Sequence, residues 1–463
     1  MTGRALTASV LTWLVVGAPV HAADILTFAR AIELGAERGL GVATSRSRVE
    51  QARLQIAATK AGGGPSLSLS SSAFSFKQID SNAILGLGGG FGGMGGLGLG
   101  GFGGLGMMGM GGMGGFGGGG GGAFTLLTTS LSLNQTVFDG HSLEDNMAIA
   151  RDGLDLAEID GLQQVRRAQF EAAQAYLQVL RARSLRHVGL EGVAQARSHV
   201  ESAALREKAG TGTRFEVLQA ETQVAAALGQ LRAASSQLDI ARLSLENLLA
   251  EPLGDRELEE SIPLPRLSFD PVSGLDEALG RRLELLSLTR KRELDGHAMT
   301  LAQHGTLPRA SVGATYQQQG LGTGRSVNVM GSLQWGLWDN GRTALQIARA
   351  AEDRHQTELT LEQTRRGLTL EIRSALLGRQ DATERLTIAQ RGLVLSQESH
   401  RLAEVRYRAG VGTGFEVIDS QAALVQAQNT LVQARYDLLA AEVRLAQALG
   451  CDLGDVVATG KRN

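Results

Sequence analysis

The chain has 463 residues and a formal net charge of −2, so no global electrostatic field directs it to nucleic acid or to an acidic surface. Aromatic residues make up only 4% of the sequence, a composition that favours long, thinly packed helices over a thick globular core. The single cysteine, Cys451, excludes an internal disulfide and a cysteine-based metal cluster.

Residues 1–22 have the pattern of a secretory signal peptide. Arg4 supplies the positive charge, Leu6–Val16 is a short apolar stretch, and a small residue at position 22 suits cleavage before Ala23. No later segment has the roughly 18 consecutive apolar residues of a membrane helix. We therefore expect an exported protein that enters a membrane, if at all, through strands.

The first predicted strand is Ser66–Phe76, and a second covers Leu131–Val137. In both, apolar and polar residues alternate, which suits a barrel strand with lipid on one side and water on the other. The same alternation also fits a small soluble sheet. Between the two strands, residues 77–123 form a glycine-rich insertion, which we expect to be a long extracellular loop.

A proline-free run from His141 to Lys208 predicts a helix of 68 residues, roughly 100 Å long. An Ala-Gly-x-Gly-Thr turn follows it, in which Gly210 stops the helix and Thr213 caps the next one, with Glu216 completing a capping box. The next helix carries a heptad seam of alternating alanine and leucine, from Ala227 to Leu248, which predicts a coiled coil.

The second half repeats this order at an offset of 200 residues. Strands are predicted at Arg309–Gln317 and Leu333–Leu337, a second proline-free helix runs from Gly341 to Arg408, and a second seam extends from Ala427 to Ala448. A repeat this long indicates a duplicated domain. The predicted organisation is a first repeat over 23–251, a proline-containing linker over 252–271, a second repeat over 272–450 and a C-terminal tail over 451–463.

The second turn differs from the first in its acidic residues. Asp419 follows Glu416 by three positions, so both carboxylates lie on one face of the helix start, whereas the first half has Gln219 at the matching position. Several copies of this turn around an axis would form an acidic collar. Helix capping alone also explains both glutamates.

The duplicated motif R-x-x-A-G-x-G-T-x-F-E-V, each copy preceded by a strand and a long helix, resembles the TolC-type outer-membrane efflux family. That resemblance implies a mainly α chain with a transmembrane β-barrel: a homotrimer in which four strands per protomer close one 12-stranded barrel above a periplasmic coiled-coil tunnel. It also implies an outer-membrane location in a Gram-negative bacterium, a periplasmic membrane-fusion adaptor, and an inner-membrane RND or ABC transporter.

The resemblance also assigns residues. The acidic aperture ring falls on Glu416 and Asp419, and a tyrosine and an acid that hold some apertures closed fall on Tyr407 and Glu216. A basic gate partner falls on Gly412, where this chain departs from the family. Contacts with the adaptor fall on the helix tips, at Ala209, Gly210, Gly212, Thr213, Ala409, Gly410, Gly412 and Thr413.

We therefore expect a passive efflux duct that is not an enzyme and holds no cofactor, because catalytic motifs are absent. A duct for type I protein secretion fits the same sequence. A soluble periplasmic coiled-coil scaffold is the alternative from a different class. It accounts for the heptads but not for four amphipathic strands placed symmetrically before the helices.

Overall fold

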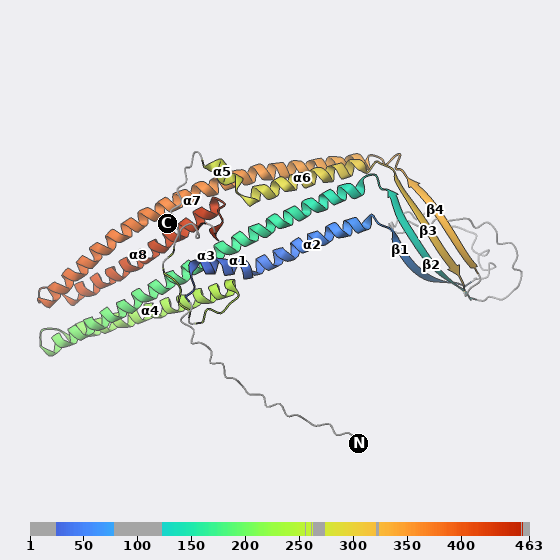
Figure 1. Cartoon of the computed structure of the whole chain (residues 1–463). Coiled ribbons are helices and arrows are strands. Elements are labelled where there is room, and N and C mark those ends of the chain that lie inside the picture. The colour runs from blue at the N-terminus through green and yellow to red at the C-terminus, as the bar shows by residue number, and fades with distance from the viewer. Residues whose placement is uncertain are drawn as a thin grey trace, which may run out of the picture. The chain divides into compact units, whose positions relative to one another are not determined.

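The computed structural model of the chain describes residues 25–77, 123–254, 256–260, 262, 274–320, 324–454 and 456 (Figure 1). The predicted signal peptide and residues 78–122 of the glycine-rich insertion lie outside this part. The chain divides into two compact units, one helical and one containing the strands, and each unit takes segments from both halves of the sequence. The sequence repeats are therefore not the compact units.

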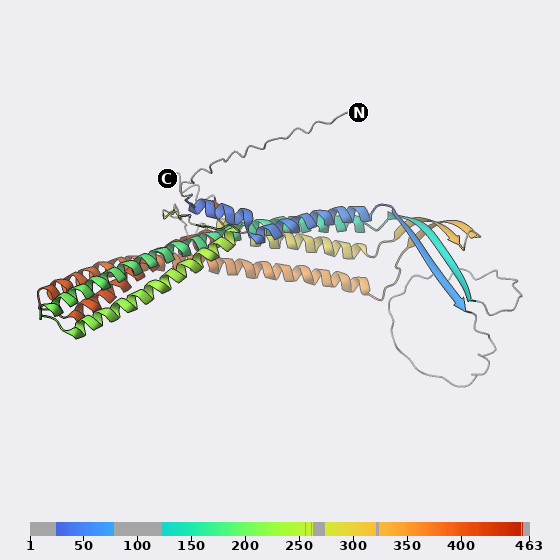
Figure 2. The same ribbon diagram turned by 90° about the horizontal axis from the view of Figure 1, so that it is seen from below.

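Eight helices cover most of the described chain, and Figures 1 and 2 show α3 with α4 and α7 with α8 as antiparallel hairpins. Helices α3 and α7 have 67 residues each, so both predicted long helices are confirmed. None of the helices in the described ranges has the length and apolar character that a membrane crossing requires. The bounds are α1 Phe28–Arg38, α2 Leu40–Gly62, α3 Ser142–Lys208, α4 Arg214–Leu249, α5 Leu275–Gly280, α6 Leu283–His304, α7 Arg342–Arg408 and α8 Gly414–Ala448.

The predicted heptad seams lie on the inward faces of α4 and α8. In α4, Ala241 and Leu245 are buried, and in α8 Ala441 and Leu445 are buried. Alanine at these positions lets neighbouring helices approach closely, which explains how a chain so poor in aromatic residues still packs.

The main core of the helical unit gathers around Tyr176 of α3. Its ring meets Phe28 edge to face at 5.4 Å, and its hydroxyl lies 2.9 Å from the carbonyls of both Leu26 and Glu259. Residues Leu26 and Leu258 form a parallel bridge. One tyrosine thus joins the start of the described chain to the segment between the repeats, and burial raises the pKa of its hydroxyl.

The strand unit is a meander with the order β1-β2-β3-β4, all antiparallel. Its strands are β1 Ser66–Lys77, β2 Ala123–Phe138, β3 Arg309–Gln319 and β4 Gly324–Gln334. Within the described residues β1 and β4 each pair with one strand only, so the sheet has two free edges. Free edges of this length need a partner strand.

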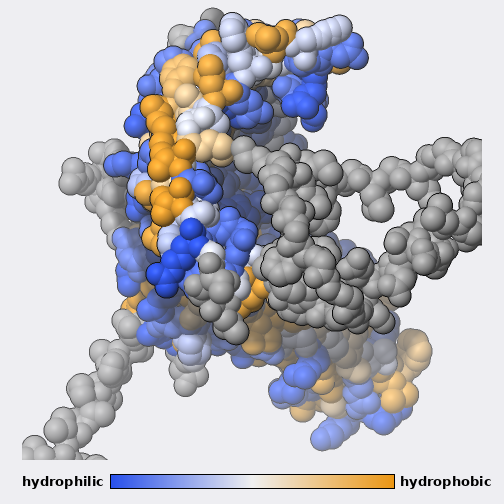
Figure 3. Space-filling view, turned by 90° about the vertical axis from the view of Figure 1, so that its right-hand side faces the viewer, coloured by the Kyte–Doolittle hydropathy of each residue, from blue (hydrophilic) through white to orange (hydrophobic). Residues whose placement is uncertain are grey.

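The register separates the two faces of the sheet. Leu69 pairs with Leu131, which pairs with Tyr316, which pairs with Val327, so apolar side chains share one face. These side chains are 39–72% exposed. The opposite face carries mainly hydroxyl and amide groups, such as the Ser70–Ser130 and Ser311–Ser332 pairs, each with 2.7 Å between the oxygens. Figure 3 shows hydrophobic residues gathered in a band beside hydrophilic ones.

The fourth strand corrects the sequence prediction. We expected alternation to continue through Trp335 to Leu337, but β4 ends at Gln334, which pairs with Arg309. The partner strand begins directly after Pro308, so nothing is left for Trp335 to pair with. Its indole N–H instead donates to the Thr306 carbonyl at 3.2 Å.

Candidate functional site at the helical tips

The two Ala-Gly-x-Gly-Thr turns have the same geometry. Gly210 and Gly410 are left-handed, with φ of 73° and 76°. A Cβ on Gly212 or Gly412 would lie 3.0 Å from the Cβ of Arg206 or Arg406 respectively, which is why the second glycine is also needed. The amides of Gly212 and Gly412 each donate to the carbonyl of that arginine at 3.0 Å.

Each turn is followed by a capped helix, as expected. The hydroxyl oxygens of Thr213 and Thr413 accept from the amides of Glu216 and Glu416, both at 3.3 Å. This is the threonine half of the predicted capping box. The glutamate carboxylates face other groups: Glu416 lies 3.7 Å from Nε of Arg406, and one oxygen of Glu216 is buried without a hydrogen-bond partner.

Between the two hairpin tips, a buried cluster surrounds Tyr407 of α7, which is only 4% exposed. The guanidinium of Arg206, from α3, lies 4.2 Å from the ring centroid and donates to the Tyr407 carbonyl at 2.6 Å. A cation over an aromatic face and a charged donor on a carbonyl are both favourable where water is excluded. Arg206 therefore ties the first hairpin to the second.

Glu216 of α4 approaches the same tyrosine. A Cβ on Gly414 would lie 3.7 Å from the Tyr407 ring and 3.8 Å from the Glu216 side chain, so both side chains pack against this glycine. Burial first, and then the Glu216 charge, raises the pKa of the Tyr407 hydroxyl. The structure thus places Tyr407 and Glu216 together, although the Tyr407 hydroxyl has no well-formed hydrogen bond.

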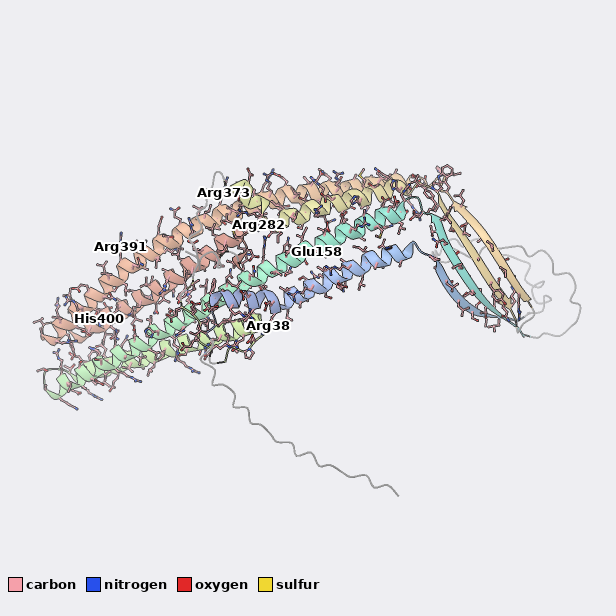
Figure 4. The ribbon with its side chains drawn as sticks, viewed as in Figure 1. Arg38, Glu158, Arg282, Arg373, Arg391 and His400 are labelled. Atoms are coloured by element: carbon pink, nitrogen blue, oxygen red, sulfur yellow. The ribbon has the colours of Figure 1, made fainter. Side chains whose placement is uncertain are left out.

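A cavity of about 400 Å³ adjoins this cluster. His400 of α7, labelled in Figure 4, has Nδ1 at 3.1 Å from the Ser420 hydroxyl and Nε2 at 3.6 Å from Glu404. His199 of α3 is 8% exposed, and its ring centroid lies 5.6 Å from that of Tyr407. Among the residues that line the cavity are His199, Arg206, His400, Glu404, Tyr407 and Gln421.

Sequence reasoning missed Arg206, His199 and His400. The resemblance places a basic gate partner at Gly412, which has no side chain, and the cation that lies beside Tyr407 is Arg206 from the other repeat. A signal was present: His199 precedes Arg206 by seven residues and His400 precedes Tyr407 by seven, so each pair shares one helix face.

The predicted acidic pair lies outside this cluster. Asp419 is exposed one turn beyond the cap, and the Glu416 side chain is 42% exposed. Among the described residues of one protomer, these two carboxylates form no enclosed site. The predicted adaptor-docking residues Ala209 and Ala409 are likewise exposed at the turns.

The fold and these duplicated tips define a class of protein. The family model for outer membrane efflux proteins matches residues 37–251 and 274–451, and the chain belongs to that family. It is an outer-membrane channel with a periplasmic helical tunnel, and works as a trimer with a periplasmic adaptor and an inner-membrane pump. The soluble periplasmic scaffold is thereby set aside.

Individual relatives and solved structures are consistent with this family assignment. The outer membrane efflux protein BepC of Brucella suis is 24% identical over 70% of this chain and 72% of its own length. TolC of Escherichia coli is 25% identical over 39% of this chain and 40% of its own. Among solved structures, CusC superposes with a TM-score of 0.73 at 15% identity, covering 92% of both chains. This likeness confirms the predicted fold class, mainly helical with a small antiparallel sheet.

Proposed function

We propose that this efflux duct is closed at its periplasmic end by the cluster around Tyr407, with Arg206 as the main tie between the two hairpins. The observation that carries the proposal is the double contact of one guanidinium, over the Tyr407 ring and on its carbonyl. Opening the tip separates α3 from α7 and breaks both contacts at once. The duct itself is passive and, in this proposal, has no catalytic role.

The strength of this tie sets a threshold for opening. A hydrogen bond from a charged donor contributes about 1.5–3 kcal/mol, and a partly buried cation–π contact contributes about 0.5–2 kcal/mol. Even the lower sum shifts an opening equilibrium by more than about tenfold, since 1.4 kcal/mol is a factor of ten. Three protomers multiply the effect.

A matched pair of variants tests the gate in planar bilayers. Arg206→Gln removes both contacts with Tyr407, whereas Arg406→Gln, at the equivalent position of the other repeat, removes only the 3.7 Å pair with Glu416. We expect Arg206→Gln to raise open probability or conductance at least tenfold and Arg406→Gln to leave opening near wild type. Equal effects of the two substitutions contradict the proposal.

We further propose that Glu416 and Asp419 of three protomers form an acidic collar at the aperture. A ring of carboxylates near a narrow pore favours cations over anions. Replacing both residues with alanine or asparagine is expected to raise conductance and weaken cation preference. If both quantities stay unchanged, only the capping role of Glu416 is left.

Two substrate classes, small molecules and secreted proteins, are represented among the relatives of this chain. Relatives include the pyoverdine export protein OpmQ of Pseudomonas putida, 25% identical over 60% of both chains, and the alkaline protease secretion protein AprF of Pseudomonas aeruginosa, 26% identical over 54% of this chain. We propose small-molecule efflux and keep protein secretion as the alternative. Complementation of an efflux-deficient and a secretion-deficient strain with this gene separates them.

A further inference from the structure

We propose that His199 makes the Tyr407 gate sensitive to protons, so that acidification of the periplasm opens the helical tip. The inference rests on the proposed gate and adds a regulation to it. His199 belongs to the first hairpin, yet its ring lies against Tyr407 of the second at 5.6 Å, in the same cluster as the Arg206 tie. Any proton on this imidazole therefore acts at the surface where the two hairpins meet.

The groups around His199 come from all the packed elements. Arg206 lies on its own helix, Glu216 on α4, and the uncharged Ser420 and Gln421 on α8. From α7 come His400, Glu404, Tyr407 and Arg408, and Arg408 is held by Glu404 at 2.9 Å. The positive and negative charges around His199 are nearly balanced. The burial of the imidazole away from water therefore determines whether its neutral or its protonated form is more stable.

Burial of the His199 imidazole favours its neutral form. Burial lowers the pKa of His199, and the proximity of His400 lowers it further, whereas the Glu404 and Glu216 charges only partly oppose the shift. In an open tip the ring is hydrated and regains a pKa of about 6.5. The closed state thus binds fewer protons than the open state.

The sign of the effect follows from proton linkage. Because the pKa of His199 is lower in the closed state, its contribution to the stability of that state is fully present above about pH 6.5. This contribution is lost as the pH falls below that value. If His199 stays neutral in the closed tip, lowering the pH from 7.5 to 5.5 shifts the equilibrium toward opening by up to about tenfold per protomer.

The experiment compares two histidine variants in planar bilayers between pH 7.5 and 5.5. His199→Gln keeps a polar side chain of similar size without a titrating group. His187→Gln is the control, because this histidine lies twelve residues earlier on α3 and is 73% exposed beside Glu191. We expect open probability to rise at acid pH in the wild type and in His187→Gln, and to stay flat in His199→Gln. A pH response in His199→Gln as large as in the wild type overturns the proposal.

A second measurement reports the movement of the hairpins directly. With Cys451 replaced by serine, spin labels are attached at Thr211→Cys and Val411→Cys, two exposed positions on the two turns. The distance between labels should increase at pH 5.5, and His199→Gln should abolish that increase. An unchanged distance in the labelled wild type overturns the proton-sensitive gate.

The two proposals fail in different ways. If Arg206→Gln opens the channel at pH 7.5 but acidification moves neither conductance nor the label distance, the gate stands and the proton sensitivity is wrong. If Arg206→Gln leaves the channel closed, the gate itself is wrong. A pH-dependent label distance that His199→Gln removes then still locates a proton-sensitive contact between the hairpins.

Discussion

Replacing Arg282 with methionine should destabilise the helical unit more than any other single loss of charge described here. Arg282, labelled in Figure 4, lies directly before α6, and its side chain is only 8% exposed. It donates to the carboxylates of Glu284 and Glu371 at 3.0–3.2 Å, and to the carbonyls of Gln447 and Ala448 at 3.0 Å each. One guanidinium thus closes the end of α8 onto α7.

The magnitude follows from what the substitution leaves behind. Removing one member of a buried ion pair costs about 3–5 kcal/mol. The two carboxylates are 43% and 44% exposed and can regain water, which reduces that figure. The Gln447 and Ala448 carbonyls each lose one donor, although Gln447 keeps the Gly450 amide at 2.9 Å. We therefore expect about 2–4 kcal/mol for Arg282→Met. Arg282→Lys should lose about half as much, because lysine keeps the charge but not the planar fork.

Urea unfolding followed by helical ellipticity measures this cost, at fixed protein and detergent concentrations because the trimer is linked to folding. Glu371→Gln is the control and should cost less than about 1 kcal/mol, as half-exposed ion pairs do. A stability of Arg282→Met within about 0.5 kcal/mol of wild type refutes the reasoning, and so does an equal loss in both variants.

Three further outcomes are expected. Gly410→Ala forces a Cβ into a left-handed turn and should cost about 1 kcal/mol, whereas Gly410→Asn should cost clearly less, as thermal unfolding of the two variants will show. Leu131→Arg, on the apolar face of β2, should make membrane insertion about 2–4 kcal/mol less favourable and so reduce the amount of trimer recovered from outer membranes. Ser130→Arg, on the hydroxyl face, should leave that amount unchanged. Tyr176→Phe should lower stability by about 1–3 kcal/mol in the same urea assay, because it removes the buried hydroxyl that lies 2.9 Å from the Leu26 and Glu259 carbonyls.

The long helices were predictable because their signals are local. Proline-free runs fix how far α3 and α7 can extend, and glycine with a positive φ ends both. The predicted helix 141–208 therefore differs from α3 by one residue. The heptad seams were also predictable from the sequence, because burial of one helix face repeats every three or four residues whatever the helix packs against.

Contacts between distant segments were not predictable in this way. Nothing near Arg206 in sequence shows that its guanidinium lies over a ring 201 residues later. The end of β4 also depended on its partner, because alternation continues past Gln334 while the paired strand has already begun at Arg309. The family resemblance assigned Tyr407 and Glu216, whereas only the structure shows His199 beside Tyr407.

Among the positions at which the two repeats differ is a pair seven residues apart, and both members of that pair adjoin the proposed gate. In the first repeat Glu207 lies 3.9 Å from Arg214, an ion pair within one hairpin whose arginine is 65% exposed and whose glutamate is 33% exposed. In the second repeat the equivalent residues are Tyr407 and Gly414, and both are buried. A Cβ at 414 would already lie in van der Waals contact with the Tyr407 ring and with Glu216, and a glutamate at 407 would offer Arg206 no ring. The Arg206 guanidinium contacts the Tyr407 ring, which has no counterpart at Glu207, so this contact between the two tips depends on the divergence between the repeats.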